Sequence, residues 1–292
     1  MTKRSLYGWN GGKYYEAKEL ISLFPKHGLY VEVFWGSGVL LLNKPKANQE
    51  FGNDKFTELI NLWEVLTNKQ MTKRLYKKMR WYIDSLSEFQ RQFNLNVEEL
   101  NRIKRAYRFL YLVKMSFQGN MTDYHSPIGG RNAKTIKDFQ LTWENTTDRL
   151  MSYHERVNKV HFYNLDFADC LDKIKPHPDK FLFLDPPYLG KRSYEKIYKG
   201  GEFKEERYNE MRDKLEEQTD GGTMWMITCE HKNDHFDKMK NITIKFIDRR
   251  GTYNRNPTRP IIKSKVIWNY DLEEVGSCSL MEEEEMGEMM QP

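Results

Sequence analysis

The residues of this chain that are best suited to chemistry follow a short apolar run. Residues 181–184 are Phe, Leu, Phe and Leu, and Asp185, Pro186, Pro187 and Tyr188 come directly after them. Four consecutive apolar residues predict a buried strand of a parallel sheet, and the prolines end it because they cannot donate to the hydrogen-bond ladder. We therefore expect Asp185 at the carboxyl end of a strand, where open α/β sheets bind their ligands.

This corner suits the methylation of an exocyclic amine on a nucleic-acid base. Such a nitrogen is a poor nucleophile because its lone pair is delocalised into the ring, so an enzyme must hold both of its protons with acceptors. Asp185 can accept one proton and the carbonyl of Pro186 the other, while Tyr188 offers a face on which the base can stack. We predict that residues 185–188 are catalytic. The motif alone fits equally well a strand that ends in a proline turn with a solvated aspartate.

A glycine turn after an earlier strand is a second candidate site. Residues 28–34 are rich in β-forming types, and Gly36, Gly38 and an apolar helix start follow them. Strand, glycine turn and helix open a dinucleotide-binding fold, but Leu41 replaces the third glycine of the pyrophosphate fingerprint. Asp54 follows Gly36 by 18 residues, near the spacing at which an acid binds ribose hydroxyls. An adenosine ligand without a pyrophosphate fits this pattern, and S-adenosylmethionine is one.

A glycine-rich loop at residues 7–13 precedes that strand. It is not a phosphate loop, because Tyr14 follows Lys13 where Ser or Thr should bind magnesium, and no strand precedes it. The loop is either a plain turn or a segment that lends Trp9 and Lys13 to the cofactor pocket.

Composition favours a protein of the reducing cytoplasm with a polyanionic partner. The formal charge of the 292 residues is +5, and it rises to about +10 without the five glutamates of residues 281–292. Cys170, Cys229 and Cys278 fit neither a disulfide framework nor zinc spacing. His231 and His235 have the spacing of a metal pair but no third ligand, so we predict no metal site. No apolar run is long enough for a signal peptide or a membrane span.

Two helical stretches between the glycine turn and the Asp185 corner mix basic with aromatic residues. Residues 71–84 and 97–115 combine side chains that suit phosphate contacts and base stacking, although solvated helix faces would look similar. A polar loop at residues 116–134 follows. Its side chains are of types that can contact base edges or fill the space that a flipped base leaves in the duplex. A mobile surface loop without a role in binding is the alternative. From these segments we predict a DNA-binding set of Lys77, Arg105, Lys114, Phe117, Asn120, Met121, Tyr124, Pro127 and Arg131.

The remaining pattern completes an α/β architecture. Residues 160–164 and 224–228 predict further strands, residues 204–218 a charged helix, and residues 242–247 with 266–270 a closing antiparallel hairpin. We predict a discontinuous catalytic domain at residues 1–62 and 158–273, an inserted, mainly helical unit at residues 63–157, and a disordered, dispensable acidic tail at residues 276–292.

With these motifs in this order, the chain resembles the Dam-like (D12 class) family of DNA adenine-N6 methyltransferases over residues 6–270. The resemblance implies a Rossmann-like, S-adenosylmethionine-dependent methyltransferase sheet with an inserted target-recognition domain, and double-stranded DNA as the substrate. It implies that Asp54 binds the cofactor's ribose, that Asp166 and Phe167 bind its adenine, and that residues 185–188 grip a flipped adenine base. The remaining cofactor-binding residues that it implies are Trp9, Lys13, Glu32, Phe34, Gly36, Gly38 and Asp185.

The resemblance leaves several points open. The family has Asn-Arg in the helix before its recognition hairpin where this chain has Val113-Lys114, so this motif does not predict the recognition sequence, and GATC is the family's common target. Methylation of cytosine N4 is an alternative, although Asp185 favours adenine over it. A DNA-binding protein of the same fold without catalytic activity is a further alternative. The oligomeric state, monomer or weak dimer, and the existence of a partner nuclease in a restriction-modification system are not encoded in these motifs.

Overall fold

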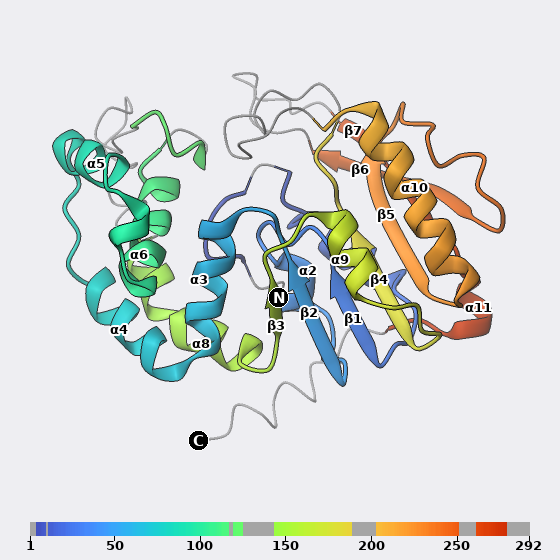
Figure 1. Cartoon of the computed structure of the whole chain (residues 1–292), viewed down its shortest axis with the longest axis horizontal. Helices are drawn as coiled ribbons and strands as arrows, with labels where there is room; N and C mark the ends of the chain where they lie inside the picture. The colour runs from blue at the N-terminus through green and yellow to red at the C-terminus, as the bar shows by residue number, and fades with distance from the viewer. Residues whose placement is uncertain are drawn as a thin grey trace.

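The computed structural model describes residues 4–9, 11–116, 119–124, 143–188, 203–250 and 261–278. Within these residues the centre of the molecule is a seven-stranded sheet in the order β3-β2-β1-β4-β5-β7-β6 (Figure 1). The first five strands are parallel, and β7 runs antiparallel to both β5 and β6. The strands are β1 Leu29–Glu32, β2 Gln49–Asn53, β3 His161–Tyr163, β4 Lys180–Leu184, β5 Met224–Glu230, β6 Thr243–Arg250 and β7 Ile261–Trp268.

Both faces of the sheet are buried, as the continuous apolar run of β4 predicted. Phe181 and Phe183 pack into one core with helices α1 (Ala17–Ser22) and α2 (Val39–Asn43), whereas Leu182 and Leu184 pack into a second core with α9 (Phe167–Lys173) and α10 (Glu205–Asp220). The α/β fold class and the closing antiparallel hairpin are therefore confirmed. The helices on the sheet are α1 Ala17–Ser22, α2 Val39–Asn43, α9 Phe167–Lys173, α10 Glu205–Asp220 and α11 Leu272–Val275.

A group of helices lies between β2 and β3 in the chain and beside β3 and β2 in space, on the left of Figure 1. It comprises α3 Thr57–Thr67, α4 Lys69–Met79, α5 Leu86–Phe93, η1 Val97–Glu99, α6 Arg102–Lys114 and α8 Leu150–Val157. We call α3 to α8 the helical segment. Helices α4 and α6 are shorter than the expected stretches 71–84 and 97–115. Side-chain caps mark where three of the helices begin: Asn68 caps α4, Ser85 caps α5 and Asn101 caps α6.

The end of the described chain returns to the first helix. Ser277 forms a bridge with Pro25, and the amide of Cys278 donates to the carbonyl of Phe24 at 2.7 Å. Ordered contacts thus extend three residues into the segment expected to be disordered, and residues 279–292 lie outside the described residues.

Candidate active site

A pocket that is partly open to solvent lies at the carboxyl ends of β1 and β4. These strands are neighbours, with Glu32 opposite Phe183, so the residues that follow each strand meet at one edge of the sheet. The N-terminal loop and the glycine turn close the other sides. The lining residues are Trp9, Gly12, Lys13, Glu32, Phe34, Trp35, Gly36, Ser37, Val39, Leu40, Asp54, Phe183, Asp185 and Pro187.

The glycine turn needs glycines for two reasons. Gly36 and Gly38 have φ angles of 49° and 64°, in the left-handed region that side chains with a Cβ rarely adopt. A Cβ on Gly36 would also come within 2.9 Å of the Trp9 ring, and one on Gly38 would collide with the ring of Trp35. The turn therefore brings its backbone close to two indole rings at the wall of the pocket.

Asp54 braces this turn from the end of β2. Its carboxylate accepts the amide of Gly36 at 3.0 Å through one oxygen and the amide of Phe56 at 3.0 Å through the other. The residue is only 2% exposed. Asp54 thus fixes the glycine turn and the start of α3, and it faces the same pocket.

Asp185 is held from two sides. Lys13, which is 3% exposed, forms an ion pair with Oδ2 of Asp185, and its Nζ also donates to the carbonyl of Gly11 at 2.9 Å. Thr228 on β5 donates its hydroxyl to Oδ1 of Asp185 at 2.6 Å. The carboxylate is therefore fixed in direction, with 19% of the side chain exposed toward the pocket.

Thr228 was missed at the sequence level, where it counted only as the last residue of a buried strand. The feature that could have identified Thr228 is its polar side chain near the carboxyl end of β5, the parallel neighbour of β4. Parallel neighbours end at the same edge of the sheet, so this side chain lies close to Asp185.

The proline turn after Asp185 is also anchored. The hydroxyl of Tyr208 on α10 donates to the carbonyl of Pro187 at 2.9 Å. Pro186 and Tyr188 are buried, and the Nζ of Lys13 lies 5.4 Å from the centre of the Tyr188 ring. The four residues predicted to be catalytic thus stay together at one corner, with Asp185 and Pro187 lining the pocket.

Glu32 is a second carboxyl group at the pocket, and it is 3% exposed. Its Oε2 accepts the hydroxyl of Tyr30 at 3.2 Å and the amide of Leu41 at 3.3 Å. Burial raises the pKa of Glu32 to about 8; these hydrogen bonds oppose the shift, and the negative charge of Asp185 adds to it. The pocket therefore contains two carboxyl groups, and a cation bound near Glu32 would favour its charged form.

Asp166 and Phe167 lie beside this pocket and not among the residues that line it. Asp166 caps α9, and it forms ion pairs with Arg207 and with Lys55, the latter at 3.1 Å. Burial alone would raise the pKa of Asp166, but hydrogen bonds from the Ala168 amide, Lys55 and Arg207 hold it below its usual value. Phe167 packs against Phe34, with ring centres 5.7 Å apart, so the pair adjoins the pocket wall.

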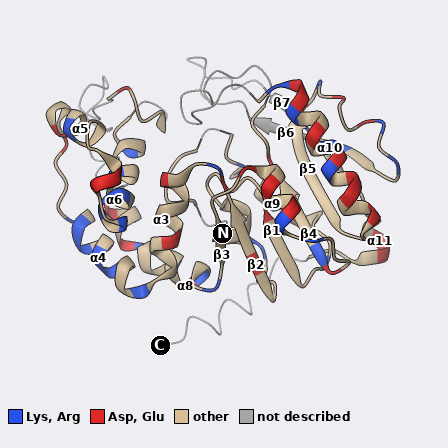
Figure 2. Cartoon of the chain, viewed as in Figure 1, with Lys and Arg blue, Asp and Glu red and all other residues tan. Residues whose placement is uncertain are grey.

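Those predicted DNA-binding residues that the structure describes are dispersed over the helical segment. Lys77 is exposed on α4, where Figure 2 shows a concentration of basic residues at the lower left of the molecule. Arg105 forms an ion pair with Glu58 at 2.5 Å, so its guanidinium already has a partner. Lys114 is half-buried at the end of α6, where burial lowers its pKa to about 8.

Residues 119–124 pack back onto the helical segment. Asn120 donates to Asp123 at 2.6 Å, and Met121 has a φ angle of 61°, which is uncommon for a residue with a side chain. Tyr124 donates to Asp84 at 2.9 Å and lies against Phe89. Phe117, Pro127 and Arg131 lie outside the described residues.

Within the described part of the chain, no group of three or more His, Cys, Asp or Glu side chains is placed to hold a metal ion. None of the helices described there is long and apolar enough to cross a membrane.

A protein-family model matches most of the chain. The model of the family described as D12 class N6 adenine-specific DNA methyltransferase matches residues 9–251. A DNA adenine methylase of Escherichia coli is 24% identical over 196 residues, and one of Salmonella typhi is 23% identical over the same length. Each alignment covers 63% of this chain and 65% of the relative, so the chain matches slightly less than two thirds of the relatives' length.

Solved structures give weaker similarities. A precorrin 8w decarboxylase of Methanobacterium thermoautotrophicum has a TM-score of 0.38 at 13% identity and covers 90% of this chain and 94% of its own. An rRNA methylase of Streptococcus thermophilus has a TM-score of 0.34 at 7% identity and covers 92% and 98%.

Proposed function

Because the chain belongs to the family of D12 class N6 adenine-specific DNA methyltransferases, we propose that it transfers the methyl group of S-adenosylmethionine to N6 of adenine in double-stranded DNA. The observation that best supports this is the meeting of Lys13, Asp54 and Asp185 at one pocket, although they are far apart in the chain.

The residues of the pocket fit S-adenosylmethionine. Its glycine turn presents backbone where a Cβ would collide with Trp9 or Trp35, and Trp9 and Phe34 offer apolar walls. The carboxyl group of Glu32 suits a ligand that carries an ammonium group, because a cation bound there would favour the charged form of this acid. Asp54 would hold the ribose, and Asp166 with Phe167 the adenine ring next to Phe34. The cofactor supplies an electrophilic methyl group, so no metal is required by the chemistry.

The protein's part in the reaction is to hold the amine. Asp185, fixed by Thr228, accepts a hydrogen bond from one N6 proton, and the Pro186 carbonyl accepts the other. This directs the nitrogen lone pair out of the ring plane, and the carboxylate stabilises the positive charge that develops on N6. The base must leave the duplex to reach this corner. Tyr188, which is buried in this structure, would stack on the base once its ring face is uncovered.

We assign target recognition to residues 63–157. Exposed lysines such as Lys77 would contact phosphates, while Lys114 and residues 117–131 would contact bases near the pocket. GATC is the first site to try, since it is the common target of the family that the chain resembles, and the proposed enzyme works as a cytoplasmic protein.

The test compares Asp185→Asn with the wild-type protein. Asn keeps the size of the side chain and an acceptor for Thr228, but it removes the charge. Transfer of labelled methyl groups to unmethylated DNA should fall at least about a hundredfold, while S-adenosylmethionine affinity measured by calorimetry should stay within a few fold. Equal losses of both would place Asp185 in cofactor binding. DNA binding without methyl transfer by the wild-type protein would instead favour a catalytically silent member of the family.

A further inference from the structure

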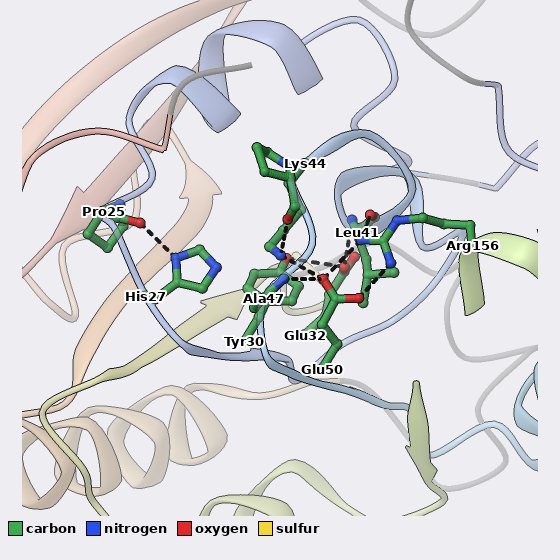
Figure 3. Close-up of polar contacts among 10 residues, drawn as sticks. Pro25, His27, Tyr30, Glu32, Leu41, Lys44, Ala47, Glu50 and Arg156 are labelled. Carbon is green, nitrogen blue, oxygen red and sulfur yellow. Dashed lines mark hydrogen bonds and ion pairs between the residues drawn. The ribbon is translucent and has the colours of Figure 1, made fainter. Parts of the chain in front are cut away.

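A network of buried polar groups connects the helical segment to the pocket (Figure 3). Arg156 on α8 has a side chain that is 6% exposed, and it binds both oxygens of Glu50 on β2, at 2.5 and 2.9 Å. Its guanidinium also donates to the carbonyl of Leu41 on α2. A single arginine thus joins α8, β2 and α2.

The peptide groups on either side of Leu41 connect Arg156 to the pocket through hydrogen bonds. The Leu41 carbonyl accepts from Arg156, while the Leu41 amide donates to Glu32, which lines the pocket. Helix α2 has only five residues, so its last carbonyls, that of Leu41 among them, have no amide partner within the helix. Contacts from outside must set where α2 lies, and its Val39 and Leu40 line the same pocket.

A second arm of the network returns to Glu32. Lys44 binds Glu50 at 2.7 Å, and its Nζ lies 4.4 Å from the centre of the Tyr30 ring. The Tyr30 hydroxyl in turn donates to Glu32 at 3.2 Å. Glu32 is therefore supported from both sides by groups that depend on Glu50. A buried ion pair adds little stability over an apolar pair of the same size, so stability alone is a weak reason for this arrangement.

We propose that Arg156 is a positioning residue for the cofactor pocket, acting through the peptide groups of Leu41 on Glu32. The inference rests on the proposed function, because it takes the pocket to bind S-adenosylmethionine. Arg156 belongs to the helical segment and does not line the pocket, but on this proposal it affects how tightly the cofactor binds.

The experiment measures S-adenosylmethionine affinity by calorimetry, DNA affinity by fluorescence anisotropy and the unfolding temperature for Arg156→Lys. Lysine keeps the charge but cannot bind Glu50 and Leu41 in the same fork. Cofactor affinity should fall about tenfold, with DNA affinity within about twofold of the wild-type value. Arg149→Lys is the matched control, because Arg149 lies next to the same helix and packs over Tyr153; both affinities should be unchanged.

A double-mutant cycle separates positioning from a general structural role. If Arg156 acts through Glu32, Arg156→Lys should cause no further loss of cofactor affinity in a Glu32→Met background. Losses that multiply, or a cofactor affinity of Arg156→Lys equal to the wild-type value, would overturn the inference while leaving the proposed function intact. Failure of the wild-type protein to bind S-adenosylmethionine would overturn both. Should Arg156→Lys not fold, Glu50→Asp replaces it, with the same expected results, because it keeps both charges and moves the shared acid by one methylene.

Discussion

Removal of the Asp54 carboxylate should lower the affinity of the pocket for S-adenosylmethionine by an amount that follows from the contacts of Asp54. Asp54 accepts two backbone amides, those of Gly36 and Phe56, and hydrogen bonds to a charged group are worth about 1.5–3 kcal/mol each. Of these two hydrogen bonds, only the one from the Gly36 amide lies in the glycine turn of the pocket. The expected hydrogen bond from the cofactor's ribose to Asp54 would cost a similar free energy when lost, either in addition to the Gly36 bond or in its place. We therefore expect Asp54→Ala to lower S-adenosylmethionine affinity about tenfold to a hundredfold.

Calorimetric titration with S-adenosylmethionine, together with thermal unfolding, checks this value. Asp54→Ala should also lower the unfolding temperature by about 5–10 °C, because two amides lose their acceptor. Asp271→Ala is the control, since Asp271 likewise accepts a backbone amide, that of Glu273 at 2.9 Å, but at the start of α11. It should lower stability and leave cofactor affinity unchanged. An Asp54→Ala protein that binds the cofactor as tightly as the wild type would refute the assignment of Asp54 to the pocket.

Three further predictions concern other parts of the molecule. Burial raises the pKa of Glu32 from 4.5 to about 8, so between these pH values the folded protein retains a proton that the unfolded chain releases. The stability of the wild type therefore falls as the pH rises from about 4.5 to about 8 and levels off above that. Glu32→Gln should gain stability relative to the wild type between about pH 5 and about pH 8 in paired urea titrations, and a difference that stays constant over this range would contradict this. Thr228→Val removes the hydroxyl that orients Asp185, so kcat should fall about tenfold with the cofactor KM nearly unchanged in steady-state assays. An unaltered kcat would show that Lys13 is sufficient to orient Asp185. Replacing Lys73 and Lys77 with Gln should weaken binding to all DNA sequences and reduce the salt slope by about one for each lost phosphate contact, and unchanged binding would mean that α4 presents only a solvated face.

The corner at Asp185 was predictable because its signal is local. An apolar strand followed by prolines places the acid at a strand end without any knowledge of the rest of the fold, and β4 ends at Leu184 as expected. The glycine turn was predictable for the same reason, since only glycine adopts its left-handed backbone easily.

Contacts between distant residues were not predictable from the pattern. Lys13 and Asp185 are separated by 172 positions, and nothing local indicates that a lysine from the N-terminal loop binds the acid after β4. Arg156 is a similar case: no sequence motif singled it out, but it is buried against Glu50, 106 positions away. Which residues form such ion pairs depends on the order of the strands in the sheet, and a single sequence does not determine that order.

The basic residues show a further limit of composition. Arg105 was grouped with Lys77 as a basic residue available to DNA, but it forms an ion pair with Glu58 on α3, whereas Lys77 is exposed. Helical periodicity identifies the face on which a side chain lies. It does not say which acid from another helix reaches that face, so the DNA-binding set stays a prediction that needs binding measurements.

The most direct test of the account is to identify the nucleoside that receives the methyl group. The wild-type protein is incubated with labelled S-adenosylmethionine and unmethylated DNA, and the DNA is then digested and its nucleosides are separated. We predict that the label appears as N6-methyldeoxyadenosine, and that Asp185→Asn yields almost none. Label in N4-methyldeoxycytidine would contradict the choice of adenine, and DNA that remains unlabelled by a folded, cofactor-binding protein would contradict the proposal that the Asp185 corner catalyses methyl transfer.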